Sequence, residues 1–180
     1  MQRAVRKKRR FVGRSRDDAT RGRLKQLLGG HIIIIGYERL KEFLRRSEGI
    51  DIDKSDMRRL SDLIGKKLND LLVIGVRNAS YNDRDIVMEP DLPLTKGFLE
   101  HMQEFRRYDE QLELKPILDQ LATYPPLERA LSLGVEEMLP DLAGTLAMLA
   151  GHAMKILDPN VKNPDDLMWE KVVCMMDLLL

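Results

Sequence analysis

The stretch from Asp56 to Tyr81 has the apolar pattern of one long helix, and this pattern constrains the fold of the chain most. Its main stripe recurs at helical spacing and comprises Met57, Leu60, Ile64, Leu68, Leu71, Leu72, Gly75 and Ala79. A second set widens the apolar surface beyond one face and comprises Leu63, Val73, Ile74 and Val76. A helix that is apolar around so much of its circumference must be covered by partners on several sides.

Shorter helical patterns flank this long stretch on both sides. Residues 37–44 carry apolar side chains at helical spacing, and Gly49 follows where a short helix would end. Beyond the long helix, Pro90 and Pro93 indicate the start of a third helix that reaches about Tyr108. The first half of the chain therefore predicts a short–long–short helix triplet.

The same order of elements returns in the second half, displaced by 74 residues. Under this shift the following residues coincide: Leu40 with Leu114, Leu44 with Leu118, Ile64 with Met138, Leu68 with Leu142, Leu72 with Leu146, Ile74 with Met148, Ala79 with Ala153, and Asp91 with Asp165. The second triplet is predicted as helices over residues 113–122, 131–157 and 167–180, the long one bent near Pro140. We expect an all-α protein with triplets at residues 36–108 and 109–180, forming one globular unit.

Charge is distributed unevenly along the chain. Residues 1–30 carry a net charge of +9, residues 31–108 are neutral, and residues 109–180 carry −8. The segment before residue 36 has little apolar surface to bury, so it is expected to be disordered or loosely helical. Three interpretations are open for it: a solvated tail without a dedicated partner, an upstream extension from a misplaced start codon, or an arm that binds nucleic acid.

Residues of the types that carry catalysis occur without useful partners. His31, His101 and His152 lack metal-ligand spacing and an evident carboxylate or thiol partner. His152 is expected to be a packed or edge histidine, and Cys174 is expected to lie in the core. No glycine-rich phosphate loop is present in the sequence. We therefore expect no enzyme activity, no metal and no cofactor.

Cysteine content and hydropathy bear on where such a chain would be located. A single cysteine excludes an internal disulfide framework and fits a reducing compartment. No apolar run approaches the ~20 residues of a membrane span. The expected location is the cytoplasm, with the nucleoid as the site of action if DNA is bound, and no membrane partner.

The connection after the first long helix holds Arg84 and Asp91 seven residues apart, with the apolar residues 86–88 between them. A short–long–short triplet with this Arg–Asp spacing resembles the histone fold. The stretch from "DIDKSDMRRLSDLIGKKLNDLL" through "YNDRDIVMEPDLP" to "LDPNVKNP" is similar to a prokaryotic family of paired histone folds in one chain, known as a domain of unknown function. The resemblance covers about residues 36–180.

This resemblance implies a specific arrangement of the two triplets. In histone folds the loop after the long helix forms a short strand that pairs with the first loop of the other triplet, and residues 86–88 fit that strand. The resemblance also implies that Arg84 folds back onto Asp91 as a structural clamp. The second copy has Asp158 at the arginine position, so this clamp is expected to be absent there. A monomer with an internal pseudo-twofold axis is expected, because both triplets are on one chain.

The residues at the positions that grip phosphate in DNA-binding histones differ from that pattern. Asp51, Asp53 and Asp85 stand in the first copy, and Lys162 is the one cation identified in the loops of the second copy. Other basic clusters are interspersed with acids and are expected to be solvated faces: Arg45 and Arg46, Arg58 and Arg59, Lys66 and Lys67, and Arg106 and Arg107.

Two functions remain open. The first is sequence-independent binding of duplex DNA, as a nucleoid-associated protein, by basic residues of the tail: Arg6, Lys7, Lys8, Arg9, Arg10, Arg14 and Arg16. The second is a protein-interaction scaffold of the heterodimerisation type that binds another protein and no DNA. The basic tail favours the first function, whereas the acidic loops and the acidic second half favour the second.

Overall fold

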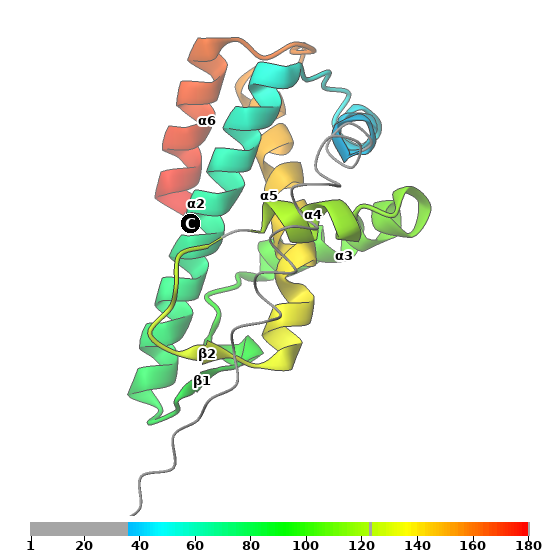
Figure 1. The fold of residues 1–180 in the computed structure, drawn as a ribbon. Helices are drawn as coiled ribbons and strands as arrows, with labels where there is room; N and C mark the ends of the chain where they lie inside the picture. The colour runs from blue at the N-terminus through cyan, green and yellow to red at the C-terminus, as the bar shows by residue number, and fades with distance from the viewer. Residues whose placement is uncertain (1–35, 123, 180) are drawn as a thin grey trace, which may run out of the picture. The chain divides into compact units, whose positions relative to one another are not determined.

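The computed structural model describes residues 36–122 and 124–179 (Figure 1). The first half contains a helix over residues 36–47, α2 (Lys54–Tyr81), β1 (Ile86–Val87), the 3-10 turn η1 (Glu89–Asp91) and α3 (Lys96–Leu112). The second half contains α4 (Lys115–Leu121), β2 (Ala130–Leu131), α5 (Leu133–Leu157) and α6 (Asp166–Leu179). The described chain is thus mostly helical, and two short–long–short helix triplets follow one another along it.

The two long helices, α2 and α5, pack against each other, and the upper end of α5 passes behind α2 in Figure 1. Leu68, Leu72, Leu142 and Leu146 are all buried, as the sequence predicted. Helices α3 and α4 pack against α5, and α6 packs against both long helices. The cover on α2 is less complete than its apolar pattern indicated, because Val73 remains 52% exposed.

Asp53 and Asp56 define the start of α2. The Asp53 side chain accepts hydrogen bonds from the backbone N–H groups of Ser55 and Asp56, and the Asp56 carboxylate accepts one from the Asp53 N–H at 2.9 Å. This reciprocal capping satisfies donors that a helix start leaves unpaired. The second Asp56 oxygen accepts a hydrogen bond from Trp169 Nε1 at 2.7 Å, so the cap also attaches α6 to α2.

The third helix begins later than its prolines indicated and ends later than predicted. Pro90 lies in the η1 turn, and α3 starts only after Thr95, whose hydroxyl accepts a hydrogen bond from the Phe98 N–H at 3.2 Å. A side-chain cap therefore sets the start, whereas the prolines shape the preceding turn. Helix α3 continues to Leu112, past the predicted boundary at residue 108.

Helix α5 contains a proline and a buried acid in succession. The helix starts after its Ser132 cap and runs through Pro140, which removes one N–H donor from its interior. The next residue, Asp141, is 4% exposed at its side chain, and it accepts Arg106 Nε at 2.7 Å and faces Lys115 Nζ at 3.0 Å. The carboxylate therefore joins α5 to both α3 and α4.

Gly144 allows α3 to approach α5 closely, because a Cβ atom there would overlap the buried ring of Phe105. We predict that Gly144→Ala lowers the free energy of unfolding by roughly 1–3 kcal/mol, since the ring has no free space to move into. Gly97, in the first turn of α3, has no heavy atom near its Cβ position, so Gly97→Ala should be at least as stable as the wild type. Urea unfolding of both variants tests this; equal stability of Gly144→Ala and the wild type would contradict the close packing.

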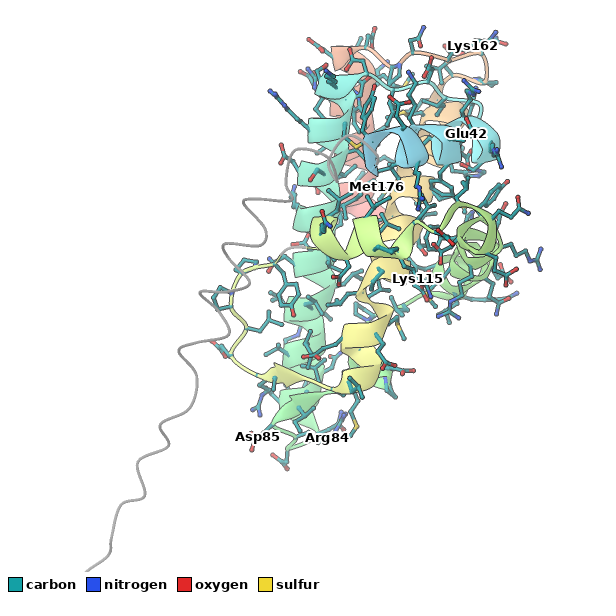
Figure 2. The ribbon with its side chains drawn as sticks, turned by 45° about the vertical axis from the view of Figure 1, so that its right-hand side comes forward. Glu42, Arg84, Asp85, Lys115, Lys162 and Met176 are labelled. Carbon is teal, nitrogen blue, oxygen red and sulfur yellow. The ribbon has the colours of Figure 1, made fainter. Side chains whose placement is uncertain are left out.

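The loops between the helices pair at the two ends of the long helices. Strands β1 and β2 are parallel, with Ile86 opposite Ala130 and Val87 opposite Leu131. The pairing of residues 86 and 87 with the first loop of the second half confirms that prediction. A second contact joins the remaining loops, where the Asp51 N–H donates to the Lys162 carbonyl at 2.7 Å. Figure 2 shows Arg84 and Asp85 at one end of the protein and Lys162 at the other.

Candidate functional site

The loop after α2 is held by a buried carboxylate, Asp91, which is 2% exposed. Arg84 binds it with its two terminal guanidinium nitrogens: Nη1 donates to Oδ2 at 2.7 Å, and Nη2 contacts Oδ1. The Met88 N–H also donates to Oδ2 at 2.8 Å, and Asn78 Nδ2 donates to the Asp91 carbonyl at 2.8 Å. This two-point pair fixes the direction in which the chain leaves α2.

Arg129 adds a second arginine to this loop pair. It precedes β2, and its Nη1 donates to the Arg84 carbonyl at 2.6 Å and to Asp85 Oδ1 at 2.5 Å, while its Nε donates to Ser80 Oγ at 2.9 Å. Arg129 was not among the predicted loop cations, because its carboxylate partner, Asp85, lies on the other loop. The signal in the sequence would have been its position directly before β2, because the pairing of β1 with β2 brings the residues that flank the two strands together.

At the opposite end, Asp51 of the other loop pair has an ion-pair partner on the helix over residues 36–47. Lys41 Nζ lies 2.9 Å from Asp51 Oδ1, and this hydrogen bond raises the pKa of Lys41 despite the opposing effect of burial. Asp158 occupies the position that Arg84 holds in the first half. Lys155 instead holds this loop, donating from Nζ to the Val161 carbonyl at 2.5 Å.

A protein-family comparison decides the relationship of the chain. Residues 40–177 match the model of a domain of unknown function, DUF1931. The chain belongs to the DUF1931 family. Two uncharacterised proteins of Aquifex aeolicus are similar to it: one is 22% identical over 120 residues, which is 67% of this chain and 70% of that protein. The other is 34% identical over 105 residues, 57% of this chain and 60% of that protein.

Solved structures resemble this DUF1931 protein as well. A crystal structure of a Thermus thermophilus protein has a TM-score of 0.71 and 46% sequence identity, covering 78% of this chain and 95% of that one. A protein of Aquifex aeolicus, also solved as a crystal structure, has a TM-score of 0.71 at 21% identity, covering 81% and 95% of the two chains. The second likeness is evidence for the fold alone.

Most basic clusters of the DUF1931 domain are engaged by acids. Arg46 Nε donates to Glu42, and Arg59 Nη2 lies 2.6 Å from Asp166. Lys67 was expected on a solvated face, but its side chain is 3% exposed and lies 2.7 Å from Asp177. Burial lowers its pKa, yet the hydrogen bonds to Asp177 and to a second carboxylate outweigh burial and leave the pKa raised.

The histidines and the cysteine differ partly from expectation. His31 and the tail residues with predicted DNA contacts lie outside the described residues. His152 does have a carboxylate neighbour, because its Nδ1 lies 3.5 Å from Glu48. The ring of His101 packs edge-on against the ring of His152. Burial raises the pKa of Glu48.

Cys174 is exposed, which contradicts its expected place in the core. Over residues 36–122 and 124–179 no cluster of three or more candidate ligands could hold a metal.

Within the described ranges, none of the helices combines the length and the apolar character needed to cross a membrane.

We predict strong coupling between Arg84 and Asp91. Arg84→Ala should lower the free energy of unfolding by roughly 1–3 kcal/mol, because it leaves the buried Asp91 carboxylate without its charged partner. The double variant Arg84→Ala/Asp91→Ala should lose less than the sum of the single losses. Denaturant titration of the four proteins measures this; additive losses would show that the pair does not stabilise the loop.

The same pair predicts a dependence on acid. Hydrogen bonding from Arg84 holds the pKa of Asp91 below its usual range, with a further contribution from the Met88 N–H. A lowered folded-state pKa stabilises the protein fully above the unfolded value of about 3.9, and this stability is lost as pH falls through the folded value. The stability difference between wild type and Asp91→Asn should therefore be constant from about pH 5 to 8 and shrink below about pH 4. A difference that stays unchanged at about pH 3 would contradict the assignment.

Proposed function

We propose that residues 36–180 form a histone-fold pseudodimer, in which the two halves take the places of the two chains of a histone dimer. Three observations support this proposal: the repeated short–long–short order, the parallel pairing of β1 with β2, and the contact of Asp51 with Lys162 at the opposite end. The Arg84–Asp91 pair agrees with the clamp of that fold. One compact unit spans residues 35–180.

On this scaffold we propose sequence-independent binding of duplex DNA by the N-terminal basic residues, and no catalytic activity. The site would comprise Arg6, Lys7, Lys8, Arg9, Arg10, Arg14 and Arg16, in a segment of net charge +9. The remaining residues 31–180 carry −8, and such a charge repels a polyanion at long range. The nucleoid would then be the site of action.

The observation that carries this proposal is the ion pairing of three cations at the paired loops, two of them on the loops and Lys41 on the helix over residues 36–47. Lys162 is exposed and forms no ion pair with a described residue. Arg84 is engaged by Asp91, Arg129 by Asp85, and Lys41 by Asp51. These loops are the places where DNA-binding histones contact phosphate, and each of these three cations already has a carboxylate neighbour. A phosphate would have to displace a carboxylate there, whereas the tail cations are separated from the acidic second half along the sequence.

A salt titration tests the proposal. Anisotropy of a labelled duplex of ~30 base pairs should show tight binding of the full chain at low salt. The logarithm of the association constant should fall with the logarithm of salt by about 0.9 for each phosphate neutralised. Duplexes of unrelated sequence should bind alike. A slope near zero, or a strong preference for one sequence, would contradict binding by a charged tail.

A protein-interaction scaffold is the second candidate function. The observation in its favour is an open groove between α2 and α6, with an apolar floor on the described surface of the domain. Binding of a protein there would need neither the tail nor the paired loops.

A further inference from the structure

An open groove runs between α2 and α6, which lie side by side in Figure 1. Its volume is about 740 Å³. Leu63 and Trp169 form part of its floor and are nearly buried, whereas Leu178 at its edge is 83% exposed. Cys174 faces the same groove and is also exposed. Helices α2 and α6 thus leave apolar surface between them that no other described element covers.

Charge along this groove is acidic. Four carboxylates and two cations line it, so its net charge is −2. The cations Arg59 and Lys66 each bind a lining carboxylate, at 2.6 Å and 2.7 Å. The two remaining carboxylates, Asp62 and Glu170, are exposed and form no ion pair with any described residue. The groove therefore offers an apolar floor with two carboxylates free to accept cations.

We propose that this groove binds an amphipathic helix of another protein, with apolar side chains on one face and Lys or Arg on its flanks. Two neighbouring helices form a groove in which a third helix packs through apolar residues at positions i, i+3, i+4 and i+7. Asp62 and Glu170 would pair with the flanking cations. This inference is independent of DNA binding and goes beyond it, since neither the tail nor the paired loops take part.

Charge also argues against the other possible occupants. A second copy of the same groove would bring two acidic rims together, and like charges across an interface are unfavourable. Duplex DNA would be repelled by the same unpaired carboxylates, and it has no apolar groups to pack against the floor of the groove. An acidic helix would be repelled in the same way. A basic amphipathic helix has apolar side chains that can pack on the floor and cations that can pair with the carboxylates at the rim.

Two natural reporters make the proposal testable in the full chain. Trp169 is the single tryptophan and Cys174 the single cysteine of the protein, and both line the groove. The probe is a synthetic peptide of ~18 residues, about five helical turns, with Leu on one face and Lys on the other. Binding should change the Trp169 fluorescence saturably at a 1:1 ratio and slow alkylation of Cys174 at least about tenfold. A peptide of the same composition with scrambled order should do neither.

Matched variants separate the groove from general attraction to an acidic protein. Asp62→Lys/Glu170→Lys should raise the Kd of the peptide at least about tenfold, which is ~1.4 kcal/mol. Glu110→Lys/Asp119→Lys changes the net charge equally at exposed positions outside the groove and should change the Kd by less than about threefold. Leu178→Glu should weaken binding, whereas Leu133→Glu, at an exposed position of α5, should not.

Three results would overturn the proposal. The first is equal weakening by both charge-reversal pairs, which would show long-range attraction only. The second is binding of the scrambled peptide as tightly as the amphipathic one. The third is a Cys174 alkylation rate that saturating peptide leaves unchanged, which would place the peptide elsewhere on the protein.

Discussion

Residues 36–112 expressed without the second half should not form a stable folded monomer. Helix α2 buries Leu60, Ile64, Leu68, Leu71 and Leu72, and much of the cover on it comes from α5 and α6. Removing that cover exposes side chains that each stabilise the fold by ~1.5–3 kcal/mol when buried. Five of them together amount to roughly 10 kcal/mol, as much as the whole stability of a typical domain, about 5–15 kcal/mol.

Circular dichroism with thermal unfolding, combined with sedimentation, measures this directly. The fragment alone should show reduced helix content without a cooperative transition, or should aggregate. Mixing it with residues 113–180 should restore a folded 1:1 complex, because β1 pairs with β2 across the two pieces. Residues 36–180 as one chain are the control. A monomeric 36–112 fragment with a cooperative thermal transition would contradict a shared core.

Periodicity was sufficient to predict the helical framework. The 74-residue correspondence placed Leu68, Leu72, Leu142 and Leu146 together, and all four are buried. Helical spacing reports which residues face the core whatever their partners are, so it survives divergence between the two halves. The strand at residues 86–87 came from the resemblance to histones, since two residues are too few for a periodic pattern.

Side chains whose environment depends on a distant segment were harder to predict. Lys67 is buried because Asp177, on α6, reaches it across the interface of α2 and α6. Cys174 is exposed because α6 directs Val172 and Met176 inward, and the residue midway between them falls on the open side. Arg129 was missed for a related reason, since its partner Asp85 is on the other loop. These contacts require the positions of two elements, which one stretch of sequence does not contain.

The candidate DNA site, in contrast, could be identified from the sequence alone. The uneven charge is visible in the sequence alone, with +9 in residues 1–30 and −8 in residues 31–180. The resemblance implied the pair of Arg84 with Asp91, whereas the pairs of Arg129 with Asp85 and of Lys41 with Asp51 were not predicted. That pairing makes the paired loops poor acceptors of phosphate and leaves the N-terminal residues as the candidate for DNA affinity.

Deleting residues 1–35 should therefore remove DNA binding almost completely. A tail that neutralises several phosphates supplies most of the affinity at low salt, so the loss should be at least about 100-fold at roughly 50 mM salt. A second variant keeps the length of the chain and replaces the seven proposed residues, Arg6, Lys7, Lys8, Arg9, Arg10, Arg14 and Arg16, with Gln. It should lose affinity to a similar extent, which would exclude an effect of chain length.

The most direct measurement is a side-by-side titration of one labelled duplex with the full chain and with residues 36–180 at the same low salt. Circular dichroism of residues 36–180 should first show that the helices remain folded. The proposal predicts tight binding by the full chain and no measurable binding by residues 36–180. Equal affinity of the two proteins would contradict it and would place the DNA surface on the folded domain.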